Sequence, residues 1–542
     1  MTVMMPPESG PIQSIPTSGI REEGLRQAGV RFSANIFTGL FSIVVNVGLG
    51  LWLTPFAIEK LGLEGYSLWP LCNNVAAYMT VLTVSITAGL ARHVTLHLEL
   101  GEQSTAAEYF TTGVALSTML ATALLLPGAV LVMFLPQIMR IPAGQERASQ
   151  VLFSFILIAF VFNVMAGCFR VSIYATQRFY LQKIQEGGTS LLRAALVLAL
   201  FVCLSPAVWQ MGLALAISSL VGLVLAVNTH RRVAPTLTCN LRLFRRERIW
   251  PLWHMGAWVF LGMVGGFLSM NSDLLVANRI LGPKQAGYLA VVLQLTAMVR
   301  MLVDLTGSIL SPVAVAYASR DDVGGLRDFT LRSTKYLGLV IALPAGVLAG
   351  AAGSLLPVWL GAEFDGLAGL VAVAMLGLVV TLPLTSLGSV FLATNTVGAS
   401  SLANLSMGVI QVALGLLLSS LTPLRLYGIV IAGIIAMGAR NTFLALRART
   451  LLRCRGRTLM GAQSPGIAAA AIAALGARIV LELWPNPGSI AAIVACAIGG
   501  AAWGIVTFIS IVSHRGDKGF LVAFLPHRMR GRMGTTAMSG EA

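Results

Sequence analysis

The sequence predicts an all-α polytopic membrane protein with about 14 transmembrane helices, arranged as two six-helix lobes and a C-terminal helix pair. Of the 542 residues, 56% are hydrophobic and 11% are charged, whereas soluble globular proteins have about 25% charged residues. Apolar runs of about 20 residues, long enough to cross a bilayer as helices, recur along the chain. Short motifs also recur in two halves of the chain, which indicates an internal repeat.

The apolar runs set the limits of the predicted spans. Short turns near 205–209 and 393–399 separate the two closest pairs. The predicted spans are 32–53, 69–91, 112–135, 151–170, 188–205, 209–228, 252–277, 286–312, 336–357, 367–393, 399–420, 426–446, 465–483 and 489–512.

These spans divide the chain into seven segments. The N-terminal sequence has neither the basic start nor the apolar core of a signal peptide, so we expect a disordered tail there. The segments are a disordered cytoplasmic tail (1–29), the first lobe (30–228), a basic cytoplasmic loop (229–251), the second lobe (252–446), a second basic loop (447–464), the last two spans (465–513) and a cytoplasmic tail (514–542).

The basic residues indicate the orientation of the chain. With both termini in the cytoplasm, 26 Lys and Arg residues fall in cytoplasmic segments, 6 in outer loops and 5 inside spans. Such a bias predicts a multi-pass protein of the bacterial cytoplasmic (inner) membrane with both termini inside. The net charge of +16 then reflects topology and attraction to anionic membrane lipid. No basic patch interleaved with aromatic residues indicates nucleic-acid binding.

Two motif pairs support the repeat. Residues 61–66 read LGLEGY and residues 281–288 read LGPKQAGY, while YATQ at 174–177 is echoed by LATN at 392–395. The offsets are nearly equal, 222 and 218 residues. Because each half has an even number of spans, the repeat is a parallel one, and transporters built in this way bind substrate between their halves.

Two longer stretches carry a family resemblance. Residues 35–71 (NIFTGLFSIVVNVGLGLWLTPFAIEKLGLEGYSLWPL) and 270–292 (MNSDLLVANRILGPKQAGYLAVV) resemble the starts of the two halves of polysaccharide transport proteins. These are the O-antigen and lipid-linked oligosaccharide flippases of the multidrug/oligosaccharidyl-lipid/polysaccharide flippase (MOP) superfamily. The resemblance covers about residues 30–515. It implies alternating access around a central cavity, and transfer of undecaprenyl-pyrophosphate-linked sugars to the outer leaflet for cell-surface polysaccharide biosynthesis. A polymerase or glycosyltransferase complex is the expected partner.

Ionisable residues at membrane depth are costly and are therefore functional candidates. Arg300 is near the middle of its span, with Asp304 four residues later on the same face. This pattern predicts either a cavity cation that meets a pyrophosphate or an internal ion pair. Arg193, expected near the cytoplasmic end of its span, meets the same phosphate or reaches the headgroups. Asp273, expected within about one turn of an outer helix end, and Asp304 are candidates for gating or for coupling to H+ or Na+.

Polar stripes supply the remaining candidates for substrate binding. Asn46 lies on a polar face of the first span, and Asn74 belongs to the second. Asn404 and Gln411 lie on one face of the eleventh. Such faces either line a wet cavity or bind neighbouring helices.

Three classes of function stay open at this point. The flippase is favoured over an ion-coupled multidrug antiporter of the same superfamily, because spans one to six have no Asp or Glu away from their ends. A membrane enzyme of polysaccharide assembly is disfavoured because the outer loops are short. No G-x-x-x-x-G-K-[ST] loop predicts ATP binding, and His93 and His97 lack the Glu of an HExxH zinc site. We therefore predict no catalytic residue, no metal and no cofactor.

Overall fold

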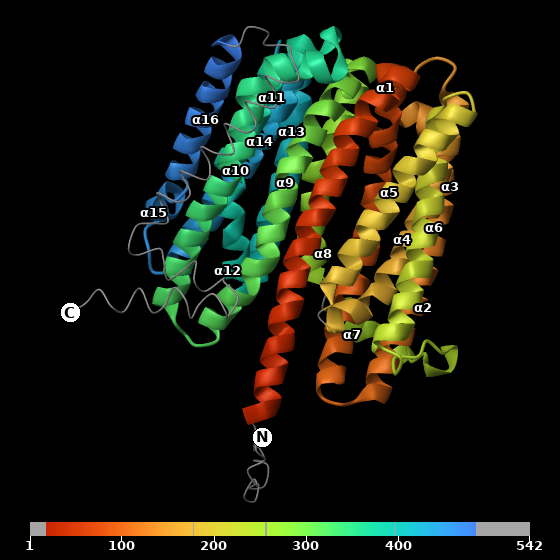
Figure 1. Ribbon diagram of the computed structural model, residues 1–542, viewed down its shortest axis with the longest axis vertical. Helices are drawn as coiled ribbons and strands as arrows, with labels where there is room; N and C mark the ends of the chain where they lie inside the picture. Colours follow the sequence, from red (N-terminus) through yellow and green to blue (C-terminus); the bar gives the residue numbers. More distant parts are fainter. Residues whose placement is uncertain (1–17, 177, 255–256, 395, 484–542) are drawn as a thin grey trace, which may run out of the picture.

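The computed structural model describes residues 18–176, 178–254, 257–394 and 396–483 (Figure 1). Within these residues, 12 helices are long and apolar enough to cross a membrane. The long helix α1 joins the first two predicted spans, and the last predicted span, 489–512, lies outside the described residues. The membrane-helix fold is thus confirmed, while the count of 14 stays a prediction.

The first lobe is formed by α1 to α6, which pack against one another. α2 and α3 follow each other almost without a break and together form one membrane crossing. The helix α1 begins inside the segment expected to be a disordered tail, so that expectation is wrong for residues 18–29, which are helical. The bounds are α1 (Ser18–Glu99), α2 (Gln103–Ala123), α3 (Leu125–Ile138), α4 (Glu146–Ala175), α5 (Phe179–Cys203) and α6 (Val208–Val233).

The linker between the lobes, residues 234–254, is fastened to the first lobe. The amide of Arg245 donates to the Thr112 hydroxyl (3.1 Å), and the Glu108 carboxylate accepts from the Arg245 and Arg248 guanidinium groups. This segment, predicted as a basic loop, is therefore held in place by hydrogen bonds and ion pairs. It contains η1 (Leu241–Leu243), η2 (Arg246–Arg248) and α7 (Ile249–His254).

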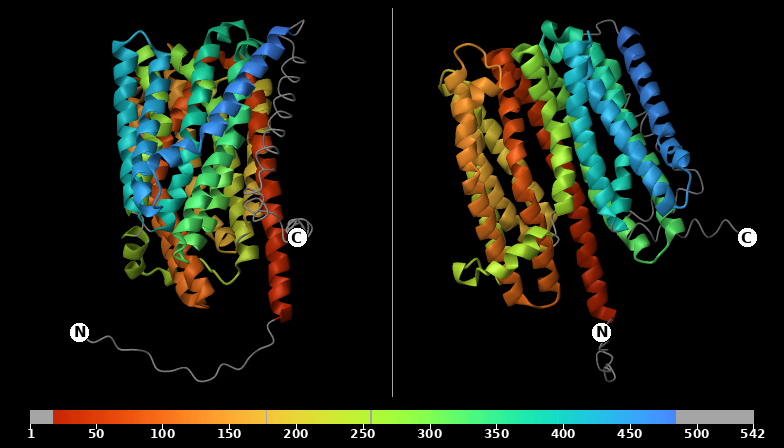
Figure 2. Two further views of the ribbon diagram at one scale, coloured as in Figure 1. Left: turned by 90° about the vertical axis from the view of Figure 1, so that its left-hand side faces the viewer. Right: turned by 180° about the vertical axis from the view of Figure 1, so that it is seen from behind.

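The second lobe follows the linker and lies beside the first (Figure 2). One predicted span, 367–393, is interrupted by the short helix η4, which starts at Pro383 because proline supplies no N–H to a helix interior. The elements are α8 (Ala257–Leu281), α9 (Pro283–Ala318), α10 (Val323–Leu360), η3 (Ala362–Leu367), α11 (Ala368–Thr381), η4 (Pro383–Ser386), α12 (Leu387–Ala393), α13 (Val397–Leu421) and α14 (Leu426–Leu451).

The last described helices cover one side of the second lobe. α15 (Gly456–Gly461) leads into α16 (Ser464–Leu483), which packs along α10. The two helices approach closely at Gly350, where a Cβ atom would lie 2.1 Å from the carbonyl oxygen of Ala474. Small residues allow such close helix packing in membranes.

The repeated motif has the same backbone conformation in both copies. Gly62 has φ 72° and Gly282 has φ 97°, a region that favours glycine, and each marks the junction between two helical segments. The copies also meet, because a Cβ atom on Gly287 would lie 2.8 Å from the Leu63 side chain. The motif thus forms corresponding turns of two lobes that pack together at this point.

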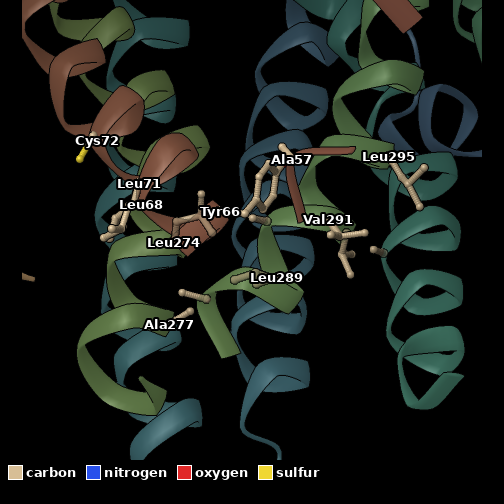
Figure 3. Packing of buried hydrophobic residues seen from close by; sticks show 14 of the residues in the cluster. Ala57, Tyr66, Leu68, Leu71, Cys72, Leu274, Ala277, Leu289, Val291 and Leu295 are labelled. Atoms are coloured by element: carbon tan, nitrogen blue, oxygen red, sulfur yellow. The ribbon is translucent and has the colours of Figure 1, made fainter. Parts of the chain in front are cut away.

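We call the end of the bundle that carries the linker the basic end, and the end with Gly62 and Gly282 the opposite end. Near the opposite end, one hydrophobic cluster includes residues of both lobes, such as Leu68, Leu71, Leu274 and Leu289 (Figure 3). We call this shared cluster the seam.

Toward the basic end, the core splits by lobe. One cluster belongs to the first lobe and the linker, with Phe110 and Leu252, and another belongs to the second lobe and α15, with Phe391 and Leu444. Among the described residues, the lobes are therefore joined through the seam and have separate cores at the basic end.

Candidate functional site between the lobes

A cavity of about 160 Å³ lies beside the seam, where both lobes contribute to its wall. Helices α1, α5 and α6 of the first lobe line it together with α9 of the second. Its polar lining residues are Asn46, Thr54, Tyr66, Ser190, Arg193 and Gln294.

Arg193 supplies the positive charge of this cavity. Because α5 begins at Phe179 and ends at Cys203, Arg193 lies about 15 Å from the helix end nearest the opposite end of the bundle. The helix starts nine residues before its apolar run, and Arg193 lies five residues into that run, so its place near the cytoplasmic end of the span stays a prediction. Among the described residues, Arg193 has neither a hydrogen-bond partner nor an ion-pair partner.

Gln294 bonds to the first lobe through both atoms of its amide. Its Oε1 accepts from the Thr54 hydroxyl (2.7 Å) and the Tyr66 hydroxyl (3.1 Å). Its Nε2 donates to the carbonyl oxygen of Gly50 (2.9 Å). The prediction of site residues missed Gln294, although a glutamine inside the apolar run VVLQLTAMV was a usable signal.

The cavity wall is also tied together within the first lobe. The Ser190 hydroxyl donates to Asn46 Oδ1 (2.9 Å), and Asn46 Nδ2 donates to the carbonyl oxygen of Ser42 (2.8 Å). These bonds hold α1 against α5, so Asn46 both lines the cavity and contributes to its shape.

A second polar cluster lies inside the second lobe and contains Asp273. Gln411 Nε2 donates to Asp273 Oδ1 (2.9 Å) and to the carbonyl oxygen of Ser269 (2.8 Å), while the Ser269 hydroxyl donates to Gln411 Oε1. Arg300 is close enough to attract the Asp273 carboxylate. Asp273 lies eight residues, or about 12 Å, before the end of α8, deeper than the single turn expected.

The predicted pairing of Arg300 with Asp304 is not tested, because the side chain of Asp304 lies outside the described residues. Arg300 is also near Asp273, which belongs to a different predicted span. The coupling role of Asp273 and Asp304 stays a prediction.

Arg440 is a membrane arginine that the sequence analysis did not name as a candidate, although it falls in the predicted span 426–446. It lies within α14, 11 residues before its end at Leu451. Its Nε donates to Asn404 Oδ1 (2.5 Å), and its Nη1 donates to Asn441 Oδ1 (2.9 Å). Asn404 is thus engaged by a cation within the second lobe.

Asn74 lies between the lobes, where its Nδ2 donates to the carbonyl oxygen of Asn271 (3.4 Å). Other polar residues of the same predicted stripe bond within their own helix. The hydroxyls of Thr80 and Thr83 donate to carbonyl oxygens of the preceding turn, at 2.6 and 2.9 Å. This part of the stripe therefore satisfies backbone groups.

Two packed helical lobes, a shared seam and a charged cavity between them define a membrane transporter of the flippase type. The comparisons agree with this class. The chain matches the family described as "Polysaccharide biosynthesis protein" over residues 72–368, more than half of its length, and it belongs to that family.

A curated relative is the "Uncharacterized membrane protein EpsK" of Bacillus subtilis (strain 168). It is 29% identical over 413 residues, which cover 76% of this chain and 81% of the relative.

Solved structures of the MOP superfamily share the fold. An inward-facing multidrug resistance MATE family transporter has a TM-score of 0.65 at 14% identity, covering 78% of this chain and 99% of that one. A MOP superfamily transporter from Pyrococcus furiosus, described as having a binding pocket of reverse polarity, has a TM-score of 0.61 at 16% identity, with 79% and 96% covered. These likenesses show that the chain shares the fold of these transporters, and they carry the fold alone.

Proposed function

We propose that this protein moves a polyprenyl-pyrophosphate-linked oligosaccharide from the inner to the outer leaflet of the bacterial cytoplasmic membrane. The observation that carries the proposal is Arg193, a guanidinium that lines the inter-lobe cavity with no ion-pair partner among the described residues. Membership of a polysaccharide biosynthesis family supports the sugar part of the substrate.

The chemistry of Arg193 favours an anionic ligand. An arginine at the centre of a membrane helix costs about 2.5–3.5 kcal/mol on insertion scales, so a ligand with the opposite charge offsets a real penalty. Guanidinium groups bind phosphate through two parallel hydrogen bonds. The hydroxyls of Thr54 and Tyr66, which line the same cavity, add donors for phosphate oxygens.

The size of the cavity decides which part of the substrate it receives. Pockets that enclose drug-sized ligands have volumes of about 300–1,000 Å³, and this cavity has about 160 Å³. In the proposal it receives the pyrophosphate, while the oligosaccharide lies toward the basic end, where the two lobes have separate cores. The polyprenyl chain remains in the lipid.

Charge and packing support the proposed direction of transport. The positive-inside rule assigns the basic end to the cytoplasm, and the cores of the two lobes are separate at that end. The opposite end is then the outer end of the bundle. Substrate would load from the cytoplasmic leaflet, and release would require the two lobes to separate along the seam at the outer end.

Complementation of a deletion strain tests the proposal. The strain should accumulate lipid-linked glycan on the inner leaflet, and the wild-type gene should restore export. Arg193→Gln, expressed at wild-type level, should reduce export by at least tenfold because it removes the charge that meets the phosphate.

Arg279→Gln is the matched control, since Arg279 is an exposed arginine near the outer end of α8. It should export glycan normally. Full export by Arg193→Gln would remove the phosphate role of Arg193. Normal export in the deletion strain would contradict the flippase and turn attention to drug efflux.

A further inference from the structure

Helix α1 contains a carbonyl group that its own helix leaves without a partner. Pro55 lies inside α1 and has no N–H, so the carbonyl oxygen of Leu51, four residues earlier, loses its helical hydrogen bond. The indole Nε1 of Trp359 donates to this oxygen at 2.6 Å. Trp359 belongs to α10 of the second lobe, so the acceptor that Pro55 leaves free is used across the lobes.

Gln294 bonds to the same turn of α1. Its Nε2 donates to the carbonyl oxygen of Gly50, the residue before Leu51, and its Oε1 accepts from Thr54, the residue before Pro55. Two side chains from different helices of the second lobe, α9 and α10, therefore hold residues 50–55 of the first lobe.

A ligand can replace a partner in these cross-lobe hydrogen bonds, whereas it cannot do so in the apolar contacts of the seam. Apolar side chains can only exchange one hydrophobic neighbour for another or for lipid. Gln294 Oε1, by contrast, is an acceptor for the Thr54 and Tyr66 hydroxyls at the wall of the Arg193 cavity. A phosphate oxygen in that cavity is an acceptor of the same kind and can take over both donors.

We propose that Gln294 and Trp359 form a latch that holds the outer end closed, and that a pyrophosphate group in the Arg193 cavity opens it by displacing Gln294. The second part rests on the proposed function, because it assigns the phosphate to Arg193. Once the Thr54 and Tyr66 hydroxyls turn to the phosphate, Gln294 keeps only its bond to the Gly50 carbonyl. The hold of the second lobe on residues 50–55 is then weaker, and the lobes separate along the seam.

The distance between the lobes at the outer end measures the latch directly. Ser205 and Glu363 are exposed residues at this end of the first and second lobes. Spin labels on Ser205→Cys and Glu363→Cys, in protein whose native cysteines are replaced, report the ratio of open to closed molecules by pulsed electron resonance in nanodiscs.

Trp359→Phe keeps an aromatic ring and removes the N–H donor, so it should raise the open-to-closed ratio about fivefold, as expected for one lost hydrogen bond. Pro55→Ala should act similarly, because its new N–H competes for the Leu51 carbonyl. The open-to-closed ratio of the double variant should be close to that of each single variant, because both substitutions remove the same hydrogen bond between Trp359 and Leu51.

Three results would overturn the latch. Trp359→Phe could leave the ratio unchanged, the two substitutions could multiply to about 25-fold as independent effects do, or Trp250→Phe could give the same shift. Trp250 is an exposed tryptophan at the basic end and serves as the matched control. Gln294→Ala provides a second test that leaves α1 and the indole intact, and it should also raise the ratio.

Inorganic pyrophosphate tests the trigger. It should raise the open-to-closed ratio in otherwise wild-type protein and have no effect in Arg193→Gln. An equal response in both proteins, or no response in either, would overturn displacement by a ligand at Arg193. The deletion strain could export glycan normally while the spin-label experiments still show the latch and its response to pyrophosphate. That combination would contradict only the lipid-linked oligosaccharide as substrate.

Discussion

At the scale of single residues, two membrane arginines show how surroundings decide a role. The guanidinium of Arg440 is taken up by Asn404 and Asn441 within its own lobe, and Asn441 in turn donates to the Thr381 carbonyl (2.7 Å). Arg193 lines a cavity instead. We therefore interpret Arg440 as a group that stabilises the second lobe and Arg193 as the group that meets the ligand.

His93 allows a prediction about pH outside the membrane spans. Its ring stacks on Tyr109 with 4.5 Å between ring centroids and lies near the linker. Burial lowers the pKa of His93 below 6.5, and the nearby charges of His97, Arg92 and Arg248 lower it further. As the pH falls below about 6.5, the unfolded chain binds a proton that the folded chain binds less well, so the folded state loses stability.

Acidification from pH 7.5 to 5.5 should therefore lower the melting temperature. The free energy of unfolding that this group contributes falls by at most about 1.4 kcal/mol per pH unit. His93→Phe keeps a flat ring on Tyr109 and cannot titrate. The measurement is thermal unfolding of detergent-solubilised protein at both pH values. A loss in His93→Phe as large as that in wild type would contradict the assignment to His93.

The sequence identified part of the site at this scale. Arg193 and Asn46 stand out because they are polar residues in apolar runs, and this signal is local. The bond between Trp359 and Leu51 joins residues 308 positions apart, and no periodicity connects them. Arg440 was missed because it lies close to the basic loop, so its charge does not stand out from the cluster that follows.

At the scale of elements, the crossing of α8 and α13 depends on glycine. A Cβ atom on Gly265 would lie 2.2 Å from the backbone of Asn404, and one on Gly408 would lie 2.5 Å from the carbonyl oxygen of Gly265. The helices are thus in backbone contact, and this contact positions Gln411 of α13 beside Asp273 of α8.

Gly265→Ala should force these helices apart and destabilise the protein by about 1–3 kcal/mol, as overpacking typically does. Gly266→Ala is the control, because a Cβ atom at this neighbouring glycine meets nothing within 4 Å. It should be neutral or slightly stabilising, since alanine is the better helix former. Both effects are measured as melting temperatures, and equal losses in the two variants would show that the crossing is not the cause.

The sequence predicted the positions of the helices more accurately than their lengths. Apolar runs mark the parts of helices that lie in lipid, so every predicted span within the described residues coincides with a helical segment. The helices extend beyond these runs with polar turns, as α10 does from Val323 to Leu360. Arg193 is therefore 14 residues into α5 but only five residues into its apolar run.

At the scale of the whole molecule, the two lobes meet through corresponding parts of the repeat. The turn with Gly62 and the turn with Gly282 both lie at the opposite end, and Gly287 of the second copy packs on Leu63 of the first. A parallel repeat places equivalent helix ends on one side of the membrane. In the proposed transport cycle, the lobes rock about the seam while the separate cores at the basic end stay intact.

Labelling of single cysteines tests this arrangement and its orientation together. Asn46 lies on α1 beside the cavity, on the side of the basic end, whereas Leu289 is fully buried in the seam. In protein without native cysteines, Asn46→Cys should react with a membrane-impermeant thiol reagent only in inside-out vesicles. Leu289→Cys should react in neither vesicle type, because the seam is closed.

Glu363→Cys is the control, since its exposed position at the opposite end should react only in right-side-out vesicles. Exchange of the two patterns, with Asn46→Cys reactive from outside and Glu363→Cys from inside, would reverse the assigned orientation. Reaction of Leu289→Cys as fast as that of Glu363→Cys would show that the lobes part at the seam without ligand. In that case the hydrogen bonds of Gln294 and Trp359 would be too weak to hold the outer end closed. If Leu289→Cys reacts slowly and the added Trp359→Phe substitution speeds its reaction, these hydrogen bonds do hold the outer end closed.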